Sequence, residues 1–190
     1  MYILKEVFMP NKKLILLLSL ITGVAFLRLL PHPPNFTPIL AMAVFAGTLI
    51  QDKRWAYAFP LGAMILGDAF LGFHSLSLVV YLSFALMVYV SHKITQGKLN
   101  YSKVALSSSV IAPLVFFVTT NFAVWAQGGI YPRTLEGLGT CFLMAIPFFK
   151  NTWTSSVMFS FILFGVHWLV FERENYRKKR LEQKKADQYV

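Results

Sequence analysis

The sequence predicts an all-α integral membrane protein, and three observations support this prediction. Of its 190 residues, 56% are hydrophobic and only 14% are charged, whereas roughly 25% of residues are charged in an average soluble domain. Apolar stretches recur along the whole chain, with short polar segments between them. The Lys and Arg residues gather in alternate polar segments, which is typical of topology signals in membrane proteins. A simple soluble globule is therefore excluded.

The apolar stretches predict one domain of six transmembrane helices, over residues 1–171. The expected spans are 14–30, 36–50, 56–73, 76–90, 104–126 and 152–171. The second and fourth stretches are shorter than the ~20 residues that cross a typical bilayer, which leaves five to seven spans open.

A further apolar stretch precedes the last span. Residues 135–149 are interrupted by Pro147 and followed by Lys150. Because a transmembrane helix needs a longer uninterrupted apolar run, we expect a short partial or re-entrant helix here, on the outer side.

The basic residues predict the orientation in the membrane. With six spans, all but three of the 18 Lys and Arg residues lie in segments on the same side, the exceptions being Arg28, Arg133 and Lys150. The positive-inside rule then places both termini in the cytoplasm and the protein in the inner (cytoplasmic) membrane. The basic tail, residues 172–190, is expected to contact anionic membrane lipid. Because the net charge of +10 is spread over topology segments, nucleic acid is not an expected partner.

Cysteine and histidine usage points to no cofactor. The single cysteine, Cys141, excludes an intrachain disulfide. The four His residues are scattered over loops and helix ends without the spacing of a zinc site, so no metal is expected.

Two ionisable residues fall inside predicted spans. Arg28 lies late in the first span and Asp68 late in the third, and both positions are in the outer half. A charged side chain at the bilayer centre costs about 2.5 to 3.5 kcal/mol on insertion scales, so such residues face a cavity or a partner. They are expected to bind a ligand, or alternatively to pair with each other.

Other polar and aromatic residues belong to the same outer layer. The candidate ligand-binding set comprises Arg28, Asn35, Asp68, Asn121, Trp125, Tyr131, Lys150 and Asn151. Charges, amides and flat rings together suit a small polar ligand with a planar part. The alternative is an interfacial aromatic belt, with Lys150 extended to the headgroups.

Ser19 and Gly23 are four residues apart on the first predicted helix. This small-xxx-small spacing allows a second helix to approach closely. The partner helix belongs either to the same chain or to a separate membrane subunit.

Several motifs resemble known families. The segments RLLPHPPNFTPILAMAVFAG (28–47), PLGAMILGDAFLGF (60–73), TNFAVW (120–125) and YPRTLEGLGTCFLMAIPFFKNT (131–152) resemble an uncharacterised bacterial family assigned to transport. The size and the acidic residue late in the third span are also distantly similar to S components of energy-coupling-factor vitamin transporters. That resemblance implies a six-helix bundle that captures a vitamin-like micronutrient and docks on a coupling membrane subunit driven by two ATPases. S components often carry Ala-x-x-x-Ala where this chain has Ser19 and Gly23.

The expected function is therefore a substrate-binding membrane subunit of a micronutrient uptake transporter. The chain is not expected to be an enzyme, since no G-x-x-x-x-G-K-[ST] loop is present and ATP hydrolysis would fall to partner subunits. The main alternative is a non-transporting scaffold similar to the small membrane proteins of the rod-shape complex. A membrane-embedded enzyme that uses Asp68 and a histidine is a third hypothesis.

Overall fold

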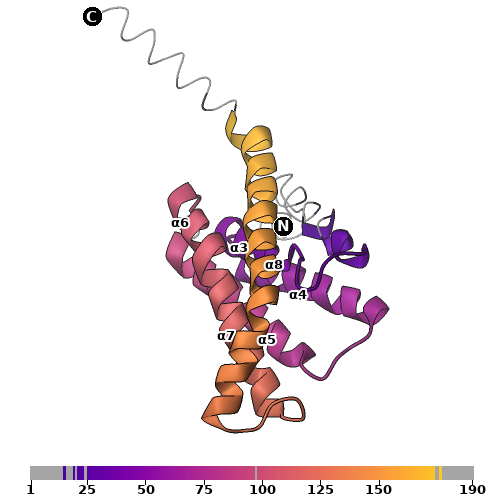
Figure 1. Ribbon diagram of the computed structural model, residues 1–190. Coiled ribbons are helices and arrows are strands. Elements are labelled where there is room, and N and C mark those ends of the chain that lie inside the picture. Colours follow the sequence, from indigo (N-terminus) through magenta and orange to yellow (C-terminus); the bar gives the residue numbers. More distant parts are fainter. Residues whose placement is uncertain are drawn as a thin grey trace, which may run out of the picture.

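A computed structural model describes residues 25–96 and 98–173, together with residues 15, 19, 21–23 and 176. All regular structure in this part of the chain is helical (Figure 1). The elements are η1 (Leu27–Leu29), α3 (Ile39–Leu49), α4 (Lys53–Leu71), α5 (Ser77–Thr95), α6 (Tyr101–Leu106), η2 (Ser107–Ile111), α7 (Ala112–Gln127), α8 (Leu135–His167) and η3 (Trp168–Glu172). The all-α prediction is confirmed for these residues.

The centre of the fold is α3, an 11-residue helix that packs against α4, α5 and α8. Every residue from Ile39 to Thr48 is buried. Phe45 contacts Phe164 of α8 edge to face, with ring centroids 5.0 Å apart. A Cβ atom at Gly47 would lie 2.4 Å from the carbonyl oxygen of Val88, so glycine lets α3 and α5 approach closely. An apolar helix without a polar face is typical of a buried position.

Three helices in the described part of the chain are long and apolar enough to cross a membrane, so the prediction of six spans is wrong. They are Ser77–Thr95, Tyr101–Gln127 and Leu135–Glu172. At about 1.5 Å per residue, α3 reaches only about half of a ~30 Å hydrocarbon core, so the predicted span 36–50 is a short internal helix. Lys53, Arg54 and Asp68 make α4 more polar. Six positions of the predicted span 14–30 lie outside the described residues, namely 14, 16–18, 20 and 24.

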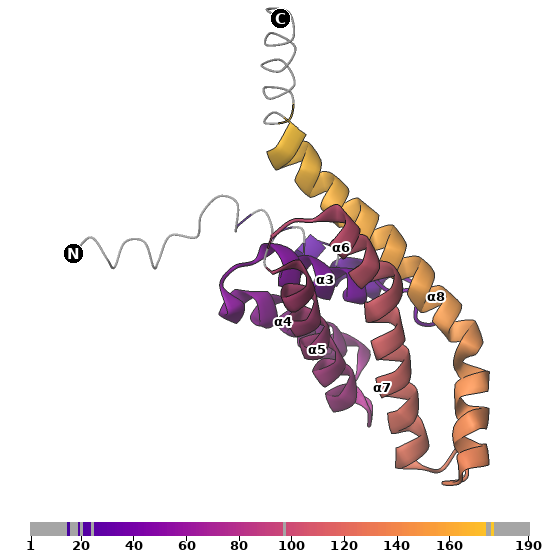
Figure 2. The ribbon, with the colours of Figure 1, turned by 90° about the vertical axis from the view of Figure 1, so that its left-hand side faces the viewer.

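The predicted partial helix 135–149 is not a separate element. It continues into the last span as α8, a single helix of 33 residues. Thr134 caps its N-terminus by accepting a hydrogen bond from the Gly137 amide at 3.1 Å. Pro147 removes one backbone donor but does not end the helix, because α7 packs along this part of α8. The ring centroids of Phe117 in α7 and Phe149 in α8 are 4.9 Å apart. Figure 2 shows that α7 and the first half of α8 form a hairpin that extends beyond the other helices.

The helix Tyr101–Gln127 contains a π-helical turn, η2, immediately before Pro113. In this turn the Ala112 amide bonds Ser107, five residues back. The Ser108 carbonyl group therefore lacks its usual donor, the Ala112 amide, and the Ser109 carbonyl group lacks its own because Pro113 has no amide hydrogen. The Ser156 hydroxyl and the Trp153 indole of α8 donate to them instead, both at 2.7 Å. These bonds join the two long helices and satisfy polar backbone that membrane lipid could not.

Candidate functional site

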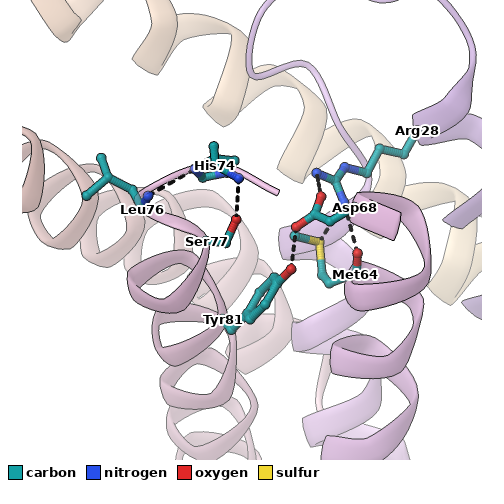
Figure 3. Close-up of polar contacts among 7 residues, drawn as sticks. All are labelled: Arg28, Met64, Asp68, His74, Leu76, Ser77 and Tyr81. Atoms are coloured by element: carbon teal, nitrogen blue, oxygen red, sulfur yellow. Dashed lines mark hydrogen bonds and ion pairs between the residues drawn. The ribbon is translucent and has the colours of Figure 1, made fainter. Parts of the chain in front are cut away.

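Arg28, Asp68 and Tyr81 form a polar cluster between η1, α4 and α5 (Figure 3). The Arg28 guanidinium donates through Nη2 to Asp68 Oδ1 at 2.5 Å, and the Tyr81 hydroxyl donates to Asp68 Oδ2 at 2.5 Å. Arg28 Nη1 also donates to the Met64 carbonyl at 3.3 Å. Both oxygens of the carboxylate therefore have a donor, as a buried charge requires.

The cluster is nearly closed to solvent. Asp68 is 1% exposed and the Arg28 side chain 15% exposed. Gly67 makes room for the guanidinium, since a Cβ atom there would lie 3.0 Å from Arg28 Nη1. Of the two alternatives for Arg28 and Asp68, pairing with each other is the one that the structure displays, and Arg28 also lines a larger cavity.

A cavity of about 400 Å³ lies beside this pair, between α4, α5, α7 and α8. Its wall contains five phenylalanines: Phe84, Phe116, Phe117, Phe148 and Phe149. Its polar lining includes Arg28, His32, Asn35, His74, Thr120 and Asn121. Phe84 of α5 stacks on Phe116 of α7, with centroids 5.7 Å apart and an interplanar angle of 26°. Flat rings with a few polar groups are typical of a small-molecule site.

Local hydrogen bonds determine which histidine nitrogen carries the hydrogen. His32 Nδ1 lies 2.9 Å from the Pro33 carbonyl, which can only accept, so Nδ1 donates and Nε2 of the neutral ring is an acceptor. His74 Nδ1 accepts from the Leu76 amide at 3.2 Å, so Nε2 carries the hydrogen. Both histidines line the cavity, and in the neutral rings Nε2 is an acceptor in His32 and a donor in His74.

Three of the predicted binding residues line this cavity: Arg28, Asn35 and Asn121. Asn35 lies in the loop before α3 with a positive φ of 60°, a conformation that asparagine tolerates better than most residues. Asn121 donates its amide to the Phe117 carbonyl at 2.8 Å, one turn back on α7. Its side-chain oxygen then remains available as an acceptor. Asp68 is behind Arg28 and does not line the cavity.

The other four predicted binding residues lie elsewhere. Trp125 donates its indole to the Pro132 carbonyl at 3.0 Å and closes the loop between α7 and α8. Asn151 donates to the Pro34 carbonyl at 2.9 Å and ties the loop before α3 to α8. Tyr131 and the exposed Lys150 do not line the cavity. Trp125 and Asn151 are better explained as loop anchors than as ligand contacts.

Several contributors were absent from the predicted set: Tyr81, His32 and the phenylalanines. The Phe-Phe pairs 116–117 and 148–149 carry a usable signal, because each lies within one turn or so of a polar residue, Asn121 or Asn151. No pattern in the sequence pairs Tyr81 with Asp68, since they belong to different helices.

Ser19 and Gly23 are both exposed. The Ser19 hydroxyl donates to the Ile15 carbonyl at 2.9 Å, and a Cβ atom at Gly23 would meet nothing within 4 Å. The face they share is therefore open in the described structure. Among the described residues, no three His, Cys, Asp or Glu side chains lie close enough to hold a metal ion.

Residues 8–181 match a family of unknown function, DUF6580, and the chain belongs to that family. Searches of curated proteins and of solved structures give no match.

Proposed function

We propose that this DUF6580 member is a substrate-binding membrane protein for uptake of a vitamin-like micronutrient, with a small, uncharged, planar ligand bound in the cavity between α5, α7 and α8. The observation that carries the proposal is the combination of aromatic walls with a donor and an acceptor imidazole in one cavity. Its volume of about 400 Å³ is within the range of ~300 to 1,000 Å³ common for small-molecule pockets.

The charge of the lining favours an uncharged ligand. Arg28 is the one Lys, Arg, Asp or Glu residue among the described residues that line the cavity, and Asp68 neutralises it at 2.5 Å. A charged ligand would lose its hydration without gaining an unpaired opposite charge. A neutral ring that carries both donors and acceptors along one edge can bond His32, His74 and Asn121, while its faces contact the phenylalanines.

The distribution of basic residues supports an outward-facing cavity. Lys53 begins α4, Lys93 lies in the last turn of α5, and Lys103 lies in the first turns of the helix that continues into α7. The cavity lies toward the opposite ends of these helices, near Leu71, His74 and Asn121. By the positive-inside rule the basic ends face the cytoplasm and the cavity faces outward.

An energy source from partner proteins completes the proposal. We propose that a coupling membrane subunit and two ATPases supply the energy, as they do for the S components of energy-coupling-factor transporters. The exposed Ser19 and Gly23 offer such a subunit a surface on which helices can approach closely.

Ligand binding can be tested with a matched pair of variants on α7. The protein is purified in mild detergent, co-purified small molecules are identified by mass spectrometry, and their affinity is measured by calorimetry. Phe117→Leu removes a cavity ring, whereas Phe122→Leu removes a ring that is 51% exposed and outside the cavity. We expect affinity to fall about fivefold in the first variant, for a lost stacking contact of about 1 kcal/mol, and to stay unchanged in the second. Equal effects in both variants would contradict the site.

The partners can be tested by affinity purification of the tagged protein from its host. Recovery of a membrane subunit with two ATPases supports the coupled importer. Recovery of cell-wall synthesis proteins instead would favour the scaffold.

A further inference from the structure

A second polar cavity lies at the opposite end of α4 and α5. Its volume is about 330 Å³, and it is lined by Lys53, Ala56, Tyr57, Val88, Tyr89, His92, Lys93 and Gln96. It shares no lining residue with the cavity described above. From this basic cavity we infer a binding site for a phosphate group, and specifically for the phosphate of an anionic phospholipid headgroup.

The charge of the basic cavity is uncompensated. Two lysines line it and no acidic residue does. The nearest acid in sequence, Asp52, caps α4 by accepting a hydrogen bond from the Arg54 amide at 2.9 Å. The one ion pair among the described residues is that of Arg28 with Asp68, so neither lysine has an acidic partner there. The first cavity differs in this respect, because Asp68 neutralises the charge of Arg28 there.

The remaining polar groups are suited to an oxyanion. His92 Nδ1 lies 3.2 Å from the Gly47 carbonyl and therefore donates to it, which fixes the imidazole against α3. Lys93 is held near the site by Tyr89, one turn earlier on α5, because its Nζ lies 5.6 Å from the centroid of the Tyr89 ring. Lys53 stands at the first position of α4, where the helix dipole also favours an anion. Tyr57 and Tyr89 add two hydroxyl groups to the lining.

The position favours a lipid as the source of the phosphate. The cavity lies at the ends of α4 and α5 that bear lysine, where the headgroups of the cytoplasmic leaflet are expected. Trp55, two residues after Lys53, is 44% exposed, and Tyr89 is 50% exposed, as is usual for aromatic residues at a membrane interface. Basic cavities between helices on this side commonly bind anionic headgroups.

The test uses the full-length protein in nanodiscs that mix phosphatidylcholine with phosphatidylglycerol. The measured quantity is the phosphatidylglycerol fraction at which half of the protein retains one such lipid in native mass spectrometry. In the variant Lys53→Gln with Lys93→Gln, we expect this fraction to rise about 25-fold, or retention to vanish, because each lysine near anionic lipid contributes a factor of about five.

The matched control is Lys98→Gln with Lys103→Gln, which removes the same charge from the same end of the bundle but outside the basic cavity. It should retain the lipid as the wild type does, and so should Lys53→Arg with Lys93→Arg. An equal loss in the Lys98 and Lys103 control would show diffuse electrostatic attraction and overturn the proposal, as would full retention in the Lys53→Gln, Lys93→Gln variant.

A second arm distinguishes the source of the phosphate. Inorganic phosphate is added at constant ionic strength, with chloride as the reference salt. Displacement of the lipid by phosphate supports a site for the phosphate group and identifies soluble phosphate as a competing source. Retention of the lipid supports recognition of the headgroup in its membrane setting.

Discussion

The two ends of the bundle differ in whether their charged side chains have a partner of opposite charge. At the end where α4 finishes, Arg28 and Asp68 are buried and neutralise each other beside a cavity with aromatic walls. At the other end, Lys53 and Lys93 are exposed, have no acidic partner among the described residues, and line a cavity without acids. Buried charges need partners from the protein itself, whereas charges at the interface are stabilised by water and lipid headgroups. Charged residues therefore pair within the protein at one end and have no acidic partner among the described residues at the other.

The largest effect is expected from breaking the buried pair. Asp68→Asn removes the charge that faces Arg28 and leaves the guanidinium uncompensated. We expect a loss of about 3 to 5 kcal/mol in the free energy of unfolding, as for other broken buried pairs. Denaturant titration in detergent, followed by helical circular dichroism, measures it. Asp52→Asn, an exposed cap on the same helix, is the control and should lose far less.

A smaller effect is expected from the third member of the cluster. Tyr81→Phe keeps the ring but removes the hydroxyl that donates to Asp68. A hydrogen bond to a charged group contributes about 1.5 to 3 kcal/mol, so stability should fall by this amount in the same titration. Tyr89→Phe, at the exposed end of α5, should have almost no effect. If both variants behave alike, Tyr81 has no special part in holding the buried pair.

Gly67→Ala probes the space beside Arg28. Alanine favours a helix by up to about 1 kcal/mol over glycine, but here its Cβ would press on Arg28 Nη1 at 3.0 Å. Gly62→Ala, on the same helix with nothing within 4 Å, should show the full gain. We expect Gly67→Ala to be the less stable of the two by several tenths of a kcal/mol, measured as a difference in melting temperature. Equal gains would mean that the guanidinium moves aside without cost.

The smallest effect on stability is expected at the basic cavity. Lys53→Gln with Lys93→Gln should change the free energy of unfolding by no more than about 0.5 kcal/mol, since both side chains are exposed. Melting curves in a neutral detergent test this. A large loss would mean that these lysines hold the fold together, and the contrast between the two ends would then fail.

Composition and the apolar runs predicted the helical class, but they did not predict the lengths of two helices, α3 and α8. The run 36–50 reads as a short span, yet α3 is an internal helix because α4, α5 and α8 surround it. The run 135–149 reads as a separate partial helix because of Pro147. It is the first half of α8, since the packing of α7 supports the chain through the proline. Neighbours that are distant in sequence decided both cases.

The candidate site was predictable in part for the same reason. Arg28, Asn35 and Asn121 were expected from their polarity in an apolar setting, and they line the cavity. Trp125 and Asn151 have an equally promising composition, but their side chains bond to nearby loops. Residue type alone does not tell a ligand contact from a loop anchor, because the same donor can serve either purpose.

The sequence by itself determined that this chain is helical, that its apolar surface suits a membrane, and that an Arg and an Asp in apolar surroundings need partners. These conclusions depend on transfer free energies, which are properties of each residue and its near neighbours. Only the tertiary structure decided that the Arg and the Asp meet, that Tyr81 completes their hydrogen bonds, and which histidine nitrogens remain free. Such pairings depend on distances between atoms on different helices, and helix packing determines these distances.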